Sequence, residues 1–169
     1  TTGTNREIDK IIEIALKLVK IDKQNGFMIS FDLSYESFQN PEERISEEIT
    51  KITGRTNEMV QRQKINWDSV EAIFEKAEFI VAHNAGFDRA FLDRYLPLSK
   101  NKIWACSIND IDWLERDFTK KALETLCFWH GFYYESHRAM NDVDALIHIL
   151  THPSYKNNKP ATELIKNSQ

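Results

Sequence analysis

The chain has 169 residues, of which 41% are hydrophobic and 11% aromatic, enough to build one compact domain around its own core. No apolar run reaches the roughly 18 residues that a membrane span needs, and the N-terminus lacks the charged-then-apolar pattern of a signal peptide. The two cysteines, Cys106 and Cys127, have no metal-binding spacing, so we expect reduced thiols. These features exclude a membrane protein and a disulfide scaffold.

The net charge is −4, from 22 basic and 26 acidic residues. This balance argues against a protein that coats nucleic acid through long-range electrostatic attraction. It does not exclude an enzyme that holds a few phosphates through bound metal ions, because the carboxylates that bind metal make such a site acidic. The charge therefore argues more strongly against a simple nucleic-acid-binding module than against a nuclease.

The pattern of apolar residues predicts two strands near the N-terminus. Residues 11–21 alternate apolar and polar side chains and are rich in β-branched residues, which is typical of a strand. Asn25-Gly26 favours a two-residue hairpin turn, and residues 27–35 alternate again as the returning strand. Further along, residues 79–82 are a continuous apolar run typical of a buried strand, and residues 103–108 predict a short strand.

Helical spacing predicts further elements between and after these strands. Because a hairpin is followed by alternating strands and helices, we expect an α/β domain with a mixed sheet over residues 1–152. Residues 153–169 read as a polar C-terminal tail with one helical turn around residues 162–166. The helices are expected at residues 46–52, closed by Gly54, and at 67–77, at 87–96, ended by Pro97, at 120–130, and at 139–150, ended by Pro153.

Two acidic residues, Asp88 and Asp142, occupy helix positions where the spacing predicts apolar side chains. An ionised carboxylate against a core is costly unless it is paired or binds a metal. A helix N-terminal cap or a buried salt bridge is the alternative explanation for either acid. Asp88 directly follows a buried strand, where α/β sheets place ligand sites, and Asp142 lies five residues after His137. Together they predict one polar cleft.

Phosphodiester hydrolysis is the chemistry that these residue types serve. Carboxylates close together hold two divalent cations about 3.5–4 Å apart, one beside the attacking oxygen and one beside the leaving oxygen. Mg²⁺ or Mn²⁺ suits such oxygen ligands. Because a histidine can accept the proton of the attacking water, His137 is the candidate general base.

Three stretches in order resemble the DnaQ-like DEDDh 3′–5′ exonucleases, a family that includes proofreading subunits of bacterial DNA polymerases. TTGTNREIDKIIEIALKLVK at residues 1–20 resembles the segment after the family's first motif. VAHNAGFDRAFL at residues 81–92 is similar to the second motif, with Asp88 at its acidic position. HRAMNDVDAL at residues 137–146 is similar to the third, and Ile52-Thr53-Gly54 resembles a turn that precedes the second motif. The resemblance covers nearly the whole chain.

The resemblance implies a ribonuclease-H-like fold with a central mixed five-stranded sheet flanked by helices. It also implies two Mg²⁺ or Mn²⁺ ions, a single-stranded or frayed 3′ end as substrate, DNA rather than RNA, association with a DNA polymerase and a bacterial cytoplasm. Asp142 and Asp88 are expected to hold metal and His137 to act as base. The residues expected to line the substrate pocket are Thr1, Thr2, Gly3, Asn84 and Phe87.

The chain departs from the family at its first motif, an Asp-x-Glu pair that ends the first strand just before Thr-Thr-Gly. Since the sequence begins at Thr1, we expect that strand and both carboxylates to precede Thr1 in the natural protein, and the chain without them to be inactive. Glu7 and Asp9 have the same spacing but fall in the following loop. The alternatives are a catalytically silent domain of the same fold that binds nucleic acid or a polymerase, and another metal-dependent phosphoesterase.

Overall fold

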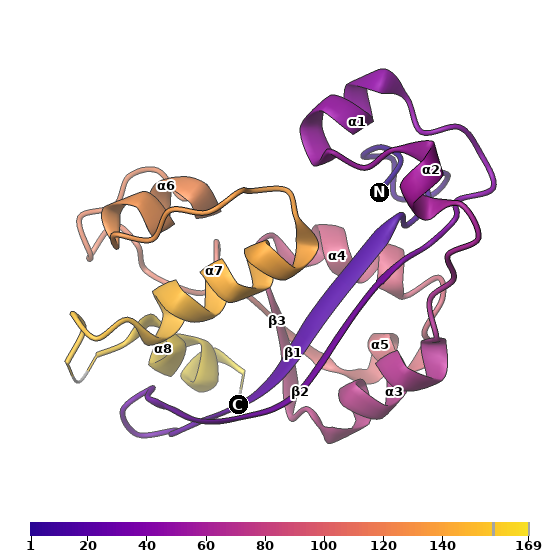
Figure 1. Cartoon of the computed structure of the whole chain (residues 1–169). Coiled ribbons are helices and arrows are strands. Elements are labelled where there is room, and N and C mark those ends of the chain that lie inside the picture. The colour runs from indigo at the N-terminus through magenta and orange to yellow at the C-terminus, as the bar shows by residue number, and fades with distance from the viewer. Residues whose placement is uncertain (157, 169) are drawn as a thin grey trace.

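A computed structural model describes residues 1–156 and 158–168 of the chain (Figure 1). The strands are β1 (Glu13–Ile21), β2 (Met28–Phe38), β3 (Phe79–Ala82) and β4 (Ile103–Cys106). The helices are α1 (Glu47–Thr53), α2 (Asn57–Val60), α3 (Trp67–Lys76), α4 (Ala85–Leu92), α5 (Pro97–Asn101), α6 (Leu123–Trp129), α7 (Ala139–Thr151) and α8 (Pro160–Asn167).

β1 and β2 form the predicted antiparallel hairpin, and the alternation of β1 divides its side chains between two layers. Ile14 and Leu16 join an apolar cluster that also contains Val70 of α3. Lys17 points to the opposite face of the strand and reaches the other layer, where its ammonium group donates to Asp144 of α7. The hairpin is therefore covered on one side by α3 and on the other by α7.

The expected two-residue turn at Asn25-Gly26 is wrong. The amide of Asp22 donates to the carbonyl of Phe27 at 2.8 Å, which closes a longer loop between the strands. The Asp22 carboxylate accepts bonds from the backbone amides of Gln24 and Asn25, and this local bonding competes with a tight turn. Gly26 supplies the left-handed backbone, with φ 73°, at the end of this loop.

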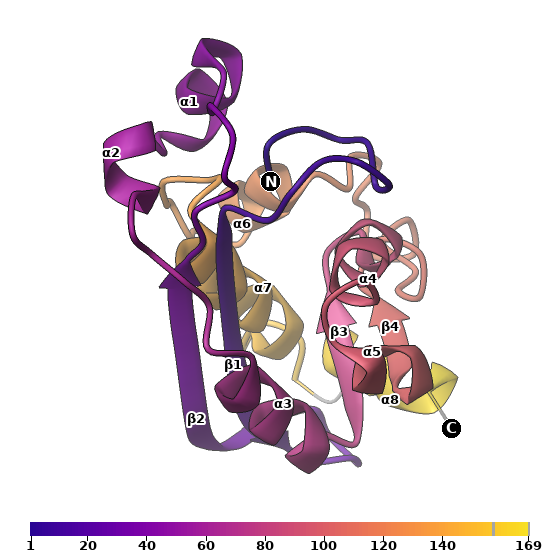
Figure 2. The same ribbon diagram turned by 90° about the vertical axis from the view of Figure 1, so that its right-hand side faces the viewer.

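β3 and β4 pair in parallel, as expected for strands connected through helices. They form a second two-stranded sheet beside the hairpin, and Figure 2 shows the two pairs as separate units. The mixed α/β class is confirmed. The single five-stranded sheet is not present in the described residues, because no strand there joins β1 to β3.

The predicted helices are present, but two of them have wrong boundaries. The helix expected over residues 120–130 begins later, at Leu123, and ends at Trp129. The helix expected over residues 87–96 begins and ends earlier, at Ala85–Leu92, and Pro97 starts α5 instead of only ending its predecessor. Proline is tolerated at a first helical position because its missing N–H would have no intrahelical partner there. α1 has the expected ends, with the Ser46 hydroxyl accepting from Ile49 and Gly54 in the left-handed conformation at its C-terminus.

The polar C-terminal segment contains a full helix, α8, in place of the single expected turn. Ala161 and Leu164 of α8 are buried in the same apolar cluster as Trp113 and Ile149. This segment therefore contributes to the core, while the domain limit at residue 152 stays a prediction. No helix in residues 1–156 or 158–168 combines the length and the apolar character that a membrane crossing requires.

Candidate active site

Two half-buried carboxylates lie in the first turns of helices that come from different parts of the fold. Asp88 is in the first turn of α4, which packs against β3 and β4. Asp142 is in the first turn of α7, which packs on β1. The positive end of a helix dipole favours negative charge at both positions. The negative charge of Asp142 acts on the pKa of Asp88, so the structure brings together the two acids that the sequence singled out.

Burial makes both carboxylates reluctant to ionise. It raises the pKa of Asp88 from 3.8 to about 6, and the negative charge of Asp142 adds to that rise. Burial also raises the pKa of Asp142, and the charge of Glu13 adds to it. Within residues 1–156 and 158–168, neither aspartate has a lysine, arginine or histidine side chain within ion-pair distance. The negative charge of the two carboxylates is therefore not balanced by a direct ion pair with a basic side chain.

Glu13 is a carboxylate in the same region whose charge is balanced by an arginine. It lies at the start of β1 on the face that carries Lys17, and its side chain is 13% exposed. Arg55 donates to both of its oxygens, from Nε at 2.8 Å and from a terminal nitrogen at 2.5 Å. This two-point ion pair neutralises Glu13. Asp88 and Asp142 have no such partner, which sets them apart as candidate ligands of a cation.

The loop before α7 is folded around the Asp142 carboxylate. The backbone amide of His137 donates to Asp142 Oδ1 at 3.3 Å, and His137 has a left-handed backbone with φ 63°. Arg138 fixes this loop to the end of α1, because its guanidinium donates to the carbonyl of Thr53 at 2.9 Å. The Arg138 guanidinium also occupies the space that a side chain at position 54 would fill. Gly54 is therefore required both for its positive φ and for this close contact.

The His137 side chain is exposed beside Asp142, and its positive charge opposes the rise in the pKa of Asp142. A non-glycine residue with positive φ is strained, and such residues gather at functional sites. The strained backbone turns the imidazole toward solvent while the amide of the same residue faces the carboxylate. This arrangement suits a group that exchanges a proton with a water molecule.

The segment at Thr1, Thr2 and Gly3 forms a closed loop near Asp88. Thr2 and Lys10 exchange two bonds, from Thr2 N to the Lys10 carbonyl at 2.8 Å and from Lys10 N to the Thr2 hydroxyl at 3.0 Å. The Thr1 hydroxyl donates to the Gly3 carbonyl at 2.5 Å. The backbone nitrogen of Thr1 lies close to the Asp88 carboxylate, so this end of the loop is beside it. The role of Thr1, Thr2 and Gly3 in lining the substrate pocket stays a prediction.

Asn84 and Phe87 have different environments at the start of α4. Asn84 is exposed, has φ 74° and makes no side-chain capping bond, which leaves its amide available to a ligand. Phe87 is half-buried against Phe91, with ring centroids 4.9 Å apart. Its ring is part of the core as well as the edge of the site, and its role in substrate binding stays a prediction.

Sequence reasoning missed three residues around this site. Glu13 is one of the alternating polar residues of the predicted strand, and its partner Arg55 carries no signal in the sequence. Tyr134 lies in an irregular segment without periodicity. Only Glu13 had a signal in the sequence. The alternation of the strand places it on the same face of β1 as Lys17, which reaches α7.

Metal-ligand geometry with three or more side chains is not seen in the described part of the chain. No group of three or more histidine, cysteine, aspartate or glutamate side chains there is arranged to hold a metal ion. The chemistry of Asp88 and Asp142 nevertheless fits a hard divalent cation, because both are oxygen donors in a region of excess negative charge. These two residues are the part of a metal site that the described chain supplies.

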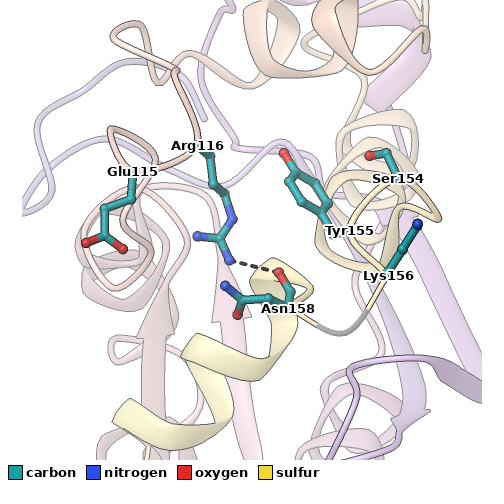
Figure 3. Close-up of a pocket in the computed structure, with 6 residues that line it drawn as sticks. All are labelled: Glu115, Arg116, Ser154, Tyr155, Lys156 and Asn158. Atoms are coloured by element: carbon teal, nitrogen blue, oxygen red, sulfur yellow. Dashed lines mark hydrogen bonds between the residues drawn. The ribbon is translucent and has the colours of Figure 1, made fainter.

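A surface pocket lies at the other end of α7 and is separate from this site (Figure 3). It has a volume of about 370 Å³, and the Arg116 guanidinium on its wall donates to the carbonyl of Asn158 at 3.0 Å and pairs with Glu163. Since that charge is already compensated, the pocket does not resemble an anion site. The residues that line it are Glu115, Arg116, Ser154, Tyr155, Lys156 and Asn158.

Residues 1–150 match the RNase_T family, which is described as an exonuclease family. The chain belongs to this exonuclease family. The DNA polymerase III of PolC type from Staphylococcus aureus is 32% identical over 162 residues, covering 88% of this chain and 10% of the relative. The corresponding protein of Bacillus subtilis is 32% identical over 161 residues, covering 89% and 10%. The chain thus spans about a tenth of the length of these relatives.

Solved structures share the fold of this exonuclease domain. Exonuclease X in complex with 5′ overhanging duplex DNA superimposes with a TM-score of 0.61 and 20% identity, covering 97% of this chain and 95% of that one. The nuclease domain of a DEDDh family member bound to rAMP gives 0.52 and 13%, covering 88% and 98%. The predicted DnaQ-like family and the ribonuclease-H-like architecture are confirmed.

The raised pKa of Asp88 predicts that this residue destabilises the metal-free fold. A carboxyl group with a raised folded-state pKa contributes stability that is fully present below pH 3.8 and lost as pH rises through about 6. Asp88→Asn removes the buried charge, so we expect the melting temperature of the metal-free protein at about pH 7.5 to rise by about 2–4 °C, or about 1 kcal/mol. Thermal unfolding in EDTA measures this.

The same comparison at about pH 3.5 is the internal control, because wild-type Asp88 is then mostly protonated in both the folded and the unfolded state. The gain should be nearly absent there. A variant that is less stable than wild type at both pH values would show that Asp88 is instead a stabilising structural residue.

Proposed function

We propose that this chain is the catalytic domain of a 3′–5′ exonuclease that hydrolyses nucleotides from the 3′ end of DNA by a two-metal mechanism. The observation that supports the proposal is the pair Asp88 and Asp142, two half-buried carboxylates without a basic partner, beside an exposed histidine. Because the chain belongs to an exonuclease family, metal-dependent phosphodiester hydrolysis explains why the pair is present. Stability alone does not account for it, because the pair costs free energy in the metal-free fold.

Asp88 and Asp142 would hold the divalent cations, Mg²⁺ or Mn²⁺, in this proposal. When bound, two such ions stabilise the attacking and the leaving oxygens of the phosphodiester. Neutralisation by the ions also removes the repulsion between the two carboxylates. Helix N-termini beneath both side chains keep the carboxylates in place while their charge is balanced.

His137 is proposed as the general base, which takes the proton of the attacking water. Its exposed imidazole can meet water and substrate, and its amide bond to Asp142 holds the residue at a defined position. Asn84 and Phe87 are proposed to contact the terminal nucleotide through the free amide and the ring edge. The backbone of the loop at Thr1, Thr2 and Gly3 would line the same pocket on the side of Asp88.

A single-stranded or frayed 3′ end of DNA is the substrate that we propose. Supporting this choice, the relatives at 32% identity are DNA polymerases of PolC type, and a structural relative is bound to duplex DNA with an overhang. The same relatives support a DNA polymerase as partner and the bacterial cytoplasm as the location. RNA is the competing substrate, since another structural relative recognises a histone mRNA stem-loop.

Asp142→Asn should abolish nuclease activity in the protein at its natural length. We expect the wild type to shorten a 5′-labelled single-stranded DNA from its 3′ end only when Mg²⁺ or Mn²⁺ is present. The variant should be slower by at least about 10³-fold, because the amide replaces a charged oxygen ligand and weakens cation binding. A time course on a denaturing gel, with DNA and with RNA of the same sequence, measures both rate and direction.

Asp144→Asn is the matched control, two residues along the same helix. Its carboxylate pairs with Lys17 and not with the site, so activity should stay within about threefold of the wild type. A folded wild-type protein that cleaves neither DNA nor RNA would contradict the proposal and leave a catalytically silent binding domain. Equal activity of wild type and Asp142→Asn would contradict the assigned site.

His137→Asn should lower kcat by about 10²–10⁴-fold and change KM little, because it removes proton transfer and not substrate binding. Asparagine is the suitable replacement, since it tolerates the left-handed backbone at this position. Steady-state kinetics with saturating Mg²⁺ measure the two constants separately. An unchanged kcat would exclude His137 as the base.

A further inference from the structure

Tyr134 lies in the irregular segment between α6 and α7, with its ring in the main core. The ring packs on the cluster that contains Cys127 of α6 and Ala145 and Leu146 of α7. The ring centroid of Phe132 is 5.8 Å away, two residues earlier on the same side of the extended segment. Ala145 is three residues after Asp142, so it lies on the same side of the helix one turn further along. This packing directs Tyr134 along α7 toward its first turn.

The hydroxyl of Tyr134 is buried and has no hydrogen-bond partner within residues 1–156 and 158–168. Leaving a buried hydroxyl unpaired costs about 1–3 kcal/mol, so such a group in a native protein calls for an explanation. Burial raises the pKa of Tyr134, and the negative charge of Asp142 adds to the rise, so the Asp142 carboxylate lies close to this hydroxyl.

We propose that Tyr134 is a positioning residue of the candidate active site, whose hydroxyl donates to the Asp142 carboxylate and sets its orientation toward a bound divalent cation. This inference rests on the proposed function of the same site. Asp142 Oδ1 accepts the amide of His137 from one side, and the phenol approaches from the core. Two donors from two directions leave the remaining lone pairs of the carboxylate facing the cleft.

Neighbours that orient a metal ligand matter nearly as much as the ligand. Loss of such a hydrogen bond costs typically about 10–100-fold in metal affinity or activity. The phenol suits this task because its ring is held in the core and its oxygen cannot turn toward solvent. In the metal-free fold the described residues leave this hydroxyl unpaired, so the proposed bond forms when the Asp142 side chain turns toward it.

Tyr134→Phe tests the inference in the protein at its natural length. The variant keeps the buried ring and removes only the unpaired hydroxyl, so its melting temperature in EDTA should equal or exceed that of the wild type. Its dissociation constant for Mn²⁺, measured by calorimetry without substrate, should rise by about tenfold or more, and the Mg²⁺ concentration for half-maximal cleavage should rise in parallel. A residue with only a structural role would lower stability and leave Mn²⁺ affinity unchanged.

Tyr133→Phe is the matched control, because Tyr133 is 74% exposed one residue earlier and should change neither quantity. Wild-type Mn²⁺ affinity in Tyr134→Phe would overturn the inference, while cleavage by the wild type would still support the exonuclease. A wild type that binds Mn²⁺ but cleaves no nucleic acid would contradict the proposed function alone, since the affinity comparison is made without substrate. A wild type that binds no Mn²⁺ would overturn both.

Discussion

The site depends on two carboxylates, Asp88 and Asp142, that are half-buried in the first turns of α4 and α7 without a basic partner. Burial and mutual repulsion raise the pKa of Asp88 to about 6, and burial also raises that of Asp142. A fold selected for stability alone would pair these acids, as it pairs Glu13 with Arg55 a short distance away. The chain leaves them free, and the cost of doing so is offset only when a cation arrives.

The scaffold keeps this unfavourable pair in place through contacts that do not neutralise it. α7 is held on the hairpin by the core and by the ion pair of Lys17 with Asp144, and α4 is held on β3 and β4. The loop before α7 is fixed by Arg138, which reaches across to the end of α1. These supports converge on the side chains of the site from separate parts of the chain, so the site depends on the tertiary fold and on no single motif.

Much of this could be predicted from the sequence, because periodicity is a local property. The alternation of β1 and the two acids on apolar helix faces are visible within a dozen residues, and the structure confirms both. The ion pair of Glu13 with Arg55 joins residues 42 positions apart, so no local sequence pattern predicts it. Tyr134 has no periodic context, and the hairpin loop was decided by the Asp22 side chain. Likewise, the segment around α8 is polar in sequence, and only the packing of Ala161 and Leu164 against the core accounts for a full helix there.

The most direct test of this account is the melting temperature of the natural-length protein with Mn²⁺ and with EDTA, followed from about pH 5 to about pH 7.5. Since Asp88 binds a cation only in its charged form, we predict that Mn²⁺ stabilises the protein at the higher pH and that the gain declines as pH falls through about 6. Identical melting temperatures with and without Mn²⁺ at about pH 7.5, or a gain that does not depend on pH, would contradict the claim that these carboxylates are held for a cation.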